Sequence, residues 1–272
     1  MASLKKPIVA ITIGEASGIG PEIVLKALEE RSALDVCRPL VIGDHKVLQR
    51  AKEVFHSNVE FRVIPTLQEA AWEGRRVNLL DLNNIPMDSF RIGYPNAVTG
   101  KAMLEYAELA VRLCMEGRLH GAVGGPHSKR AVHDAGIPFD GYPGFVGRMT
   151  GSRYPFMMLV AGKLRVTNAT LHVSLRKALD LIKKDLILEA IKATHEAVKT
   201  FGVSKPKIAV AALNPHAGEG GMFGEEDETE IGPAVIAASQ LGMAVVGPLP
   251  ADTLFCGCME ALYDAYIGMY HD

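Results

Sequence analysis

The sequence predicts an α/β protein with a mainly parallel sheet. Short apolar runs that end at glycine or proline alternate with longer segments in which apolar residues recur every three to four positions. Residues 8–13 form a β-branched run that ends at Gly14, and residues 208–213 form an apolar run that ends at Asn214. Runs of this kind are typical of buried strands, and their alternation with helical segments indicates successive β-α units.

The individual elements follow from these runs and from the glycines and prolines between them. Pro21 suits the first turn of a helix over residues 22–30, because its missing N–H would lack a partner there anyway. Residues 99–116 have the periodicity of an amphipathic helix. Further helices are expected at residues 175–184, 186–200 and 228–241. Further strands are expected at residues 39–42, 59–64, 77–80, 122–123, 156–160, 164–169 and 244–246, with a hairpin across Gly162.

Composition restricts the class of protein. The chain has 29 basic and 31 acidic residues with no basic block, which predicts that nucleic acid is not a partner. No stretch approaches the roughly 20 apolar residues of a membrane span. The sequence therefore predicts a soluble, cytoplasmic protein, and its 272 residues allow one large domain or two moderate ones.

Three histidines each follow an apolar segment: His172, His216 and His271. In open α/β sheets ligands bind at the carboxyl ends of strands, so the three imidazoles are candidates for one metal site. Imidazole suits zinc, cobalt or nickel better than magnesium. Asp252 and Asp272 are candidates to orient them, because a ligating imidazole usually donates its second N–H to such a group. A structural role for each histidine stays open, since spacing does not prove convergence.

Two glycine-rich loops offer further candidates. Residues 14–21 follow a predicted strand and precede a predicted helix, which suits either an anion-binding nest or a turn that merely packs tightly. Residues 124–130 contain His127, Ser128, Lys129 and Arg130 at another strand end. Their cations suit a carboxylate or phosphate, and a solvated loop with ordinary surface charges is the alternative.

Five separated segments resemble the 4-hydroxythreonine-4-phosphate dehydrogenase family, in the same order along the whole chain. They are residues 14–22, 134–139, 214–221, 247–253 and 269–272. The resemblance implies a two-domain α/β/α fold like isocitrate and isopropylmalate dehydrogenases, with a cleft between the domains, and a homodimer. Residues 1–123 and 248–272 would form the first domain, which a further C-terminal segment completes in the family. Residues 124–247 would form the second, with the dimer interface and the metal site.

The resemblance also implies a site and a reaction. His172, His216 and His271 match the family's ligands for a divalent metal (zinc, cobalt or magnesium), one of them supplied by the partner protomer. Asp252 and Asp272 match its nearby acidic residues and are predicted to be catalytic. The family reaction is metal-assisted oxidation of a secondary alcohol β to a carboxylate, with hydride transfer to NAD and loss of CO2.

The loop at residues 127–130 is predicted to contact the substrate, a small hydroxy acid. The vitamin B6 (pyridoxine) branch of the family, whose substrate is phosphorylated, typically has asparagine or histidine where this chain has Ser128. Residues 141–144 read GYPG where that branch has GHTE. The Pro126-His127 and Gly141-Tyr142-Pro143 pattern resembles relatives that oxidise the cis-dihydrodiol of terephthalate with loss of CO2, so the substrate stays open between these two classes.

Two other functions remain open at this point. Family members continue beyond the Tyr270-His271-Asp272 motif into a segment that carries substrate-binding residues and much of the NAD site. A truncated protein that binds ligands without dehydrogenase activity is therefore the main alternative. An NAD-free phosphate-transfer enzyme rests only on the glycine-rich turn, and the absence of a P-loop lysine disfavours it.

Overall fold

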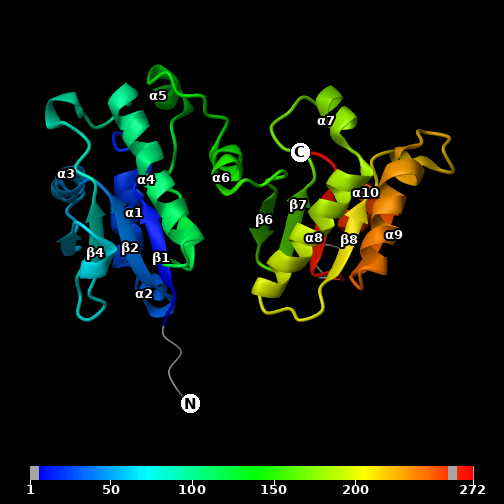
Figure 1. The fold of residues 1–272 in the computed structure, drawn as a ribbon, viewed down its shortest axis with the longest axis horizontal. Helices are drawn as coiled ribbons and strands as arrows, with labels where there is room; N and C mark the ends of the chain where they lie inside the picture. The colour runs from blue at the N-terminus through cyan, green and yellow to red at the C-terminus, as the bar shows by residue number, and fades with distance from the viewer. Residues whose placement is uncertain (1–5, 257–261, 272) are drawn as a thin grey trace, which may run out of the picture. The chain divides into compact units, whose positions relative to one another are not determined.

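Two compact units make up the structure, a computed structural model that describes residues 6–256 and 262–271. Unit 1 is Met1–Ser152 and unit 2 is Arg153–Asp272. Among the described residues each unit is built on one five-stranded sheet with helices packed against it (Figure 1). The α/β fold predicted from the alternation of apolar runs is thus confirmed.

Unit 1 contains an entirely parallel sheet. Its strands, in spatial order, are β3 (Phe61–Ile64), β4 (Val77–Asp81), β2 (Arg38–Gly43), β1 (Ile8–Thr12) and β5 (Gly121–Val123). Its helices are α1 (Gly20–Glu29), α2 (Arg31–Val36), α3 (His45–Phe55), α4 (Ala97–Met115), α5 (Lys129–Asp134) and α6 (Tyr142–Thr150). Short 3₁₀ turns lie at Leu67–Glu69 and Met87–Ser89.

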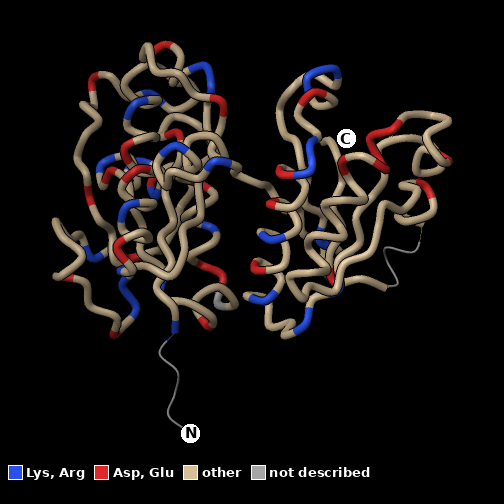
Figure 2. Tube along the Cα trace, turned by 45° about the vertical axis from the view of Figure 1, so that its right-hand side comes forward, with Lys and Arg blue, Asp and Glu red and all other residues tan. Residues whose placement is uncertain are grey.

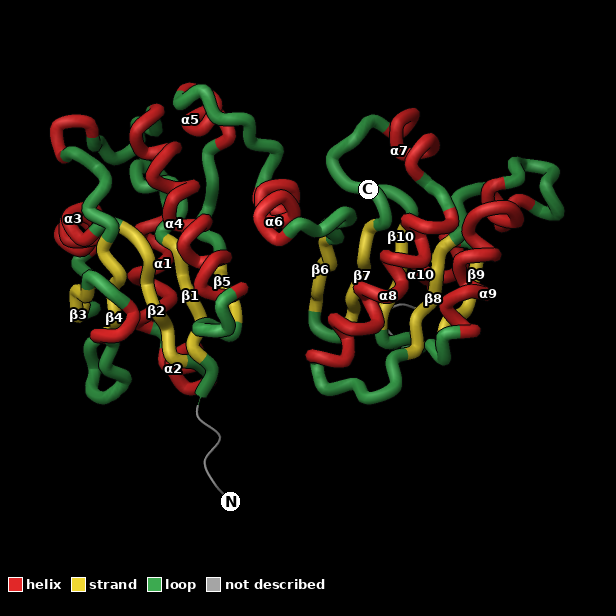
Figure 3. Tube along the Cα trace, in the orientation of Figure 1, coloured by secondary structure: helices red, strands yellow, loops and turns green. Residues whose placement is uncertain are grey.

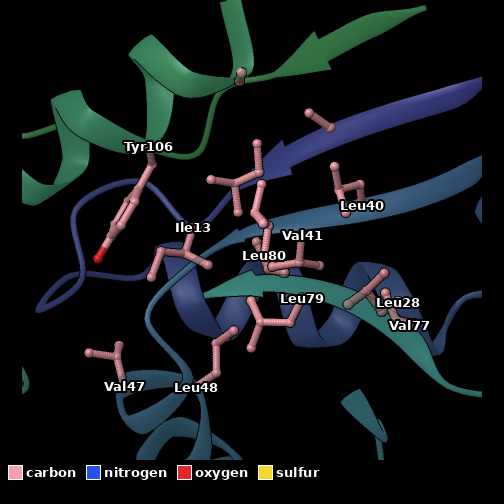
Figure 4. Packing of buried hydrophobic residues seen from close by; sticks show 14 of the residues in the cluster. Ile13, Leu28, Leu40, Val41, Val47, Leu48, Val77, Leu79, Leu80 and Tyr106 are labelled. Atoms are coloured by element: carbon pink, nitrogen blue, oxygen red, sulfur yellow. The ribbon is translucent and has the colours of Figure 1, made fainter. Parts of the chain in front are cut away.

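The core of unit 1 lies on both faces of this sheet. Figure 4 shows Tyr106 of α4 on one side of the strands, and Leu28 of α1 and Leu48 of α3 on the other. Leu40 and Ile42 of β2 are fully buried, as a central strand of a parallel sheet covered by helices on both faces requires. This packing explains why the strand sequences are continuous apolar runs.

Unit 2 contains a mixed sheet. Its strands, in spatial order, are β6 (Met157–Ala161), β7 (Leu164–Asn168), β10 (Ala265–Gly268), β8 (Lys207–Ala211) and β9 (Ala244–Leu249). Only the β6–β7 pairing is antiparallel among the described strands, and it is the hairpin expected across Gly162. The remaining elements are α7 (Leu175–Leu181), α8 (Lys184–Thr200), a 3₁₀ turn (Pro215–Gly218), a π-helical turn (Asp227–Ile231), α9 (Gly232–Gln240) and α10 (Ala251–Cys256).

Strand alternation divides the core of unit 2 between the two faces of its sheet. Ile208 and Val210 of β8 belong to the cluster that includes residues of α8 and α9. Ala209 and Ala211 belong to the cluster that includes Leu254 of α10. Because successive side chains of a strand point to opposite faces, one short run supplies both cores.

The compact units do not coincide with the domains expected from the sequence. β10, which the sequence places in the first domain, forms its ladders with β7 and β8 in the sheet of unit 2. Residues 124–152, expected in the second domain, lie in unit 1. The physical reason is packing, because Val132 of α5 is buried against Met103 of α4.

Candidate metal site and substrate loop

Three neighbouring strands of unit 2 end in segments that carry the three candidate histidines. β7, β10 and β8 are adjacent and parallel, so their carboxyl ends lie at one edge of the sheet. His172 follows β7, His271 follows β10, and His216 follows β8. In Figures 1 and 3 the segment after β10 lies at the same edge as α7, which begins just after His172. All three histidines therefore follow the carboxyl ends of neighbouring strands in one unit.

His172 and His271 lie close together. Beyond the strands, the Ala169 N–H donates to the Gly268 carbonyl oxygen over 2.8 Å, and the Thr170 hydroxyl donates to the Met269 carbonyl oxygen over 2.8 Å. These bonds carry the two segments side by side to the histidines, whose ring centres are 5.7 Å apart. Both rings line a cavity of about 190 Å³ together with residues including Thr170, Tyr270 and Ala178.

The spacing of these two rings fits one metal ion. An imidazole nitrogen lies about 2.0–2.1 Å from bound zinc, so two imidazoles on one tetrahedral ion have ring centres roughly 5 Å apart. The observed separation of 5.7 Å is within several tenths of an ångström of that arrangement. Both side chains are exposed and free to receive a ligand. No group of three His, Cys, Asp or Glu side chains suited to a metal occurs within the described residues of this chain.

His216 lies on the loop after β8, whose backbone is strained. The backbone φ is 54° at His216 and 56° at Ala217. Residues other than glycine rarely adopt this left-handed backbone conformation. The exposed ring of His216 lies 6.1 Å from that of Phe223. Strain of this kind persists only where neighbouring structure enforces it.

Asp227 holds the loop that carries His216. Its carboxylate is 1% exposed and accepts hydrogen bonds from the N–H groups of Leu213 at 2.9 Å and Asn214 at 3.0 Å. The Asn214 side-chain amide in turn donates to Glu226 over 2.8 Å, and this bond lowers the pKa of Glu226. Asp227 was not predicted as a functional residue, and its one signal in the sequence is its place just before a predicted helical segment.

Of the two predicted catalytic aspartates, Asp252 lies within the described residues. Asp252 lies in the first turn of α10, is exposed, and accepts a hydrogen bond from the N–H of its neighbour Thr253 over 2.7 Å. Among the described residues, Asp252 does not belong to any group of three His, Cys, Asp or Glu side chains that could hold a metal. Asp272 lies outside the described residues.

The loop predicted to contact the substrate lies in unit 1, after β5. Ser128 caps α5 by accepting a hydrogen bond from the Ala131 N–H over 3.2 Å. Arg130 pairs with Asp134 at 2.8 Å on the same helix. Lys129 is exposed, and its charge, after the stronger hydrogen bond from Arg148, helps to lower the pKa of Asp140. Ser128 and Arg130 therefore each have a partner on α5.

His127 lies against an aromatic pair. Its ring centre is 5.3 Å from that of Phe139 and 5.1 Å from that of Tyr142, both edge-on. Tyr142 donates its hydroxyl to the Gly125 carbonyl oxygen over 2.9 Å, and burial raises its pKa to about 12 despite a hydrogen bond with Thr12. Tyr142, where this chain departs from the vitamin B6 pattern, therefore packs against His127.

The glycine-rich turn after β1 packs tightly against the same loop. Gly14 has φ 68°, and a Cβ on it would collide with the Pro126 carbonyl oxygen. The Glu15 N–H donates to that oxygen over 2.8 Å. Both carboxylate oxygens of Glu15 and the hydroxyl of Ser17 are buried without a hydrogen-bond partner among the described residues. A buried carboxylate disfavours an anion there, so the structure supports the tightly packed turn over the anion nest.

Positively and negatively charged residues are distributed along both units. Figure 2 shows Lys and Arg interspersed with Asp and Glu along both units. Within the described residues no helix has the length and apolar character needed to cross a membrane.

Two α/β units with histidines at the carboxyl ends of parallel strands are an arrangement in which α/β enzymes bind ligands. Residues 35–272 match the family described as "Pyridoxal phosphate biosynthetic protein PdxA", and the chain belongs to this family. A Clostridium botulinum relative, provisionally named a D-threonate 4-phosphate dehydrogenase, is 36% identical over 267 residues that cover 98% of this chain and 80% of the relative. A Fusobacterium nucleatum relative with the same provisional name is 38% identical over 264 residues, which cover 97% and 79% of the two chains.

Solved structures agree with the sequence relatives. A 4-hydroxythreonine-4-phosphate dehydrogenase from Burkholderia phymatum has a TM-score of 0.88 and 37% identity, covering 99% of this chain and 82% of its own. A terephthalate 1,2-cis-dihydrodiol dehydrogenase from Burkholderia xenovorans has a TM-score of 0.72 and 31% identity, covering 98% and 80%. The predicted family, fold and enzyme class are confirmed, and the chain is a metal-dependent, NAD-linked oxidoreductase.

Proposed function

We propose that this protein oxidises a secondary alcohol β to a carboxylate in a small hydroxy acid, passes the hydride to NAD, and releases CO2. The pair of imidazoles at the ends of β7 and β10 carries the proposal, because its 5.7 Å spacing suits one divalent ion. A bound ion would supply Lewis acidity toward the substrate hydroxyl. We also propose that the protein is cytoplasmic, as expected from the sequence.

His172 and His271 would hold the ion with His216. Imidazole ligands favour zinc or cobalt over magnesium. His216 lies on a loop of its own, braced by Asp227, and we assign its role to the metal site of a second protomer in a homodimer. Asp252 and Asp272 are the proposed carboxylates that orient the imidazoles and complete the catalytic set.

Lys129 and His127 are the proposed substrate contacts within residues 127–130. Ser128 caps the N-terminus of α5, and Arg130 forms an ion pair with Asp134 on the same helix. We therefore assign these two residues the role of positioning the loop. A lysine ammonium suits either phosphate or carboxylate as a point charge. The named relatives act on D-threonate 4-phosphate, 4-hydroxythreonine-4-phosphate or a terephthalate dihydrodiol. We therefore propose a phosphorylated hydroxy acid as the substrate, with a dihydrodiol dicarboxylate as the second candidate.

The decisive experiment measures NAD reduction at 340 nm with zinc or cobalt present. The substrates are 4-hydroxythreonine 4-phosphate, D-threonate 4-phosphate and the terephthalate dihydrodiol, with released CO2 measured in parallel. We expect turnover with one class of substrate, loss of turnover in His216→Ala, and retained turnover in His133→Ala, which replaces an exposed histidine of α5. Full activity of His216→Ala would contradict the proposal.

The ligand-binding alternative makes a different prediction. It requires metal or carboxylate binding by calorimetry with neither NAD binding nor NAD reduction. Measurable NAD affinity in the 272-residue chain would reject it.

A further inference from the structure

A second cavity lies in unit 1, away from the residues assigned above. It has a volume of about 840 Å³. Arg38 at the start of β2 and Val77 at the start of β4 line it, which places it at the amino-terminal edge of the parallel sheet. The turn at residues 14–20 and the loop at residues 124–130 follow β1 and β5 and so lie at the carboxyl edge. The cavity is therefore separate from the proposed substrate loop.

Cationic side chains outnumber carboxylates around this cavity. Lys6, Arg38, Arg75 and Arg76 line it, against Glu29 and Glu60. The chain as a whole carries a formal charge of −2, so this local excess of positive charge is not a general property of the surface.

Both carboxylates already have partners. Glu60 pairs with Arg76 at 3.3 Å. Glu29 accepts hydrogen bonds from the Ser57 hydroxyl at 2.7 Å and the Asn58 N–H at 3.2 Å. Within the described part of the chain, neither Arg38 nor Arg75 has an ion-pair partner, although Arg38 is half-buried. Two guanidinium groups at one cavity are thus left for an anion from outside.

The cavity also has an aromatic and apolar wall. Trp72 is half-buried and packs against the core of unit 1, and it lines the cavity together with Leu28, Leu34 and Val59. An indole face and a guanidinium plane both stack on flat π-systems. A wall of this kind favours a planar ring over a bare inorganic ion.

We infer that this cavity, here called the Trp72 pocket, binds a small planar ring that carries a phosphate or carboxylate. The ring stacks against Trp72 and the anion pairs with Arg38 and Arg75. The volume of about 840 Å³ lies within the range of roughly 300–1,000 Å³ that is usual for small-molecule sites. The inference is independent of the metal site and of the proposed reaction, because no candidate histidine or substrate-loop residue lines the pocket.

Trp72 itself reports binding, since it is the only tryptophan of the chain. Fluorescence excited at 295 nm is followed while the whole protein is titrated with phenyl phosphate, benzoate, phenol or inorganic phosphate. We expect saturable quenching by phenyl phosphate or benzoate, with a Kd at least tenfold lower than for phenol or phosphate. Comparing the two charged rings distinguishes phosphate from carboxylate as the preferred anion.

Matched variants locate the binding. The double variant Arg38→Gln/Arg75→Gln should raise the Kd at least tenfold, and Arg50→Gln, an exposed arginine of α3 outside the pocket, should leave it unchanged. Arg75→Gln alone changes an exposed loop residue and should raise the Kd at least threefold, which decides the matter if the double variant fails to fold. Quenching that never saturates, or an unchanged Kd in these variants, would overturn the inference.

Discussion

His172 and His271 have ring centres 5.7 Å apart at the ends of two adjacent parallel strands. They are separated by 98 intervening residues, and two hydrogen bonds beyond the strand ends, from Ala169 to Gly268 and from Thr170 to Met269, bring them together. The proximity is therefore a property of the sheet, because the backbone ladder and not local sequence sets it.

Replacing either histidine of this pair should weaken metal binding. We expect His172→Ala and His271→Ala each to lower zinc affinity at least about tenfold, because loss of an orienting partner alone typically costs 10–100-fold. Competition with a chromophoric chelator measures the affinity. His133→Ala should retain wild-type affinity, and equal affinity in all three variants would show that the pair binds no metal.

Asp227→Asn should loosen the loop of His216. The substitution keeps the shape of the side chain but puts an N–H₂ group opposite one of two backbone N–H donors, so we expect a loss of about 1–3 kcal/mol in the free energy of unfolding. Urea denaturation measures this loss, and limited proteolysis should show faster cleavage within residues 214–224. Asp180→Asn, an exposed aspartate of α7, is the control, and equal stability of both variants would reject the bracing role.

Glu230 should make stability depend on acid pH. The Lys184 N–H at 2.8 Å is the main cause of its lowered pKa, and Lys183 at 3.0 Å adds to it. A lowered pKa in the folded state stabilises the protein above the ordinary glutamate value of about 4.3, and the contribution disappears as pH falls through the folded-state pKa.

Unfolding curves of wild type and Glu230→Gln between pH 7 and pH 3 measure this contribution. We expect the variant to be less stable at neutral pH by up to about 1 kcal/mol, with the difference shrinking below about pH 4.3. Glu196→Gln removes an exposed glutamate of α8 that accepts no backbone hydrogen bond from the described residues, and should show a smaller effect. A difference that stays constant down to pH 3 would contradict the assignment.

Gly14→Ala should destabilise unit 1 more than Gly117→Ala. Both glycines have a left-handed backbone, with φ 68° and 69°, so both substitutions cost roughly 1–2 kcal/mol for conformation. Only at Gly14 would the new methyl group collide with backbone, at Gly125 and Pro126, while nothing lies within 4 Å of the position at Gly117. The difference between the melting temperatures of the two variants measures the destabilisation caused by the collision at Gly14. Equal melting temperatures would show that the collision does not destabilise the protein.

Much of the fold was predictable because strands, helices and turns follow from the pattern of apolar residues and glycines in short segments of the sequence. The apolar run at residues 208–213 identified β8, and Gly162 identified the β6–β7 hairpin. The pairing of β10 between β7 and β8 was not predictable in this way, since it joins distant segments: Tyr266 pairs with Val166, and Ala265 pairs with Ile208. The compact units depend on contacts of this kind too, and the domain division expected from the sequence stays a prediction.

The sequence by itself determined the succession of strands and helices, the placing of three histidines after apolar runs, and the family, because periodicity and short motifs are local. Only the tertiary structure decided that His172 and His271 meet, that Asp227 braces the loop of His216, and that Trp72 and three arginines line one cavity. It also decided that the carboxylate of Glu15 is buried with no hydrogen-bond partner among the described residues. Those relationships depend on strand order and side-chain packing between distant segments, which no local pattern specifies.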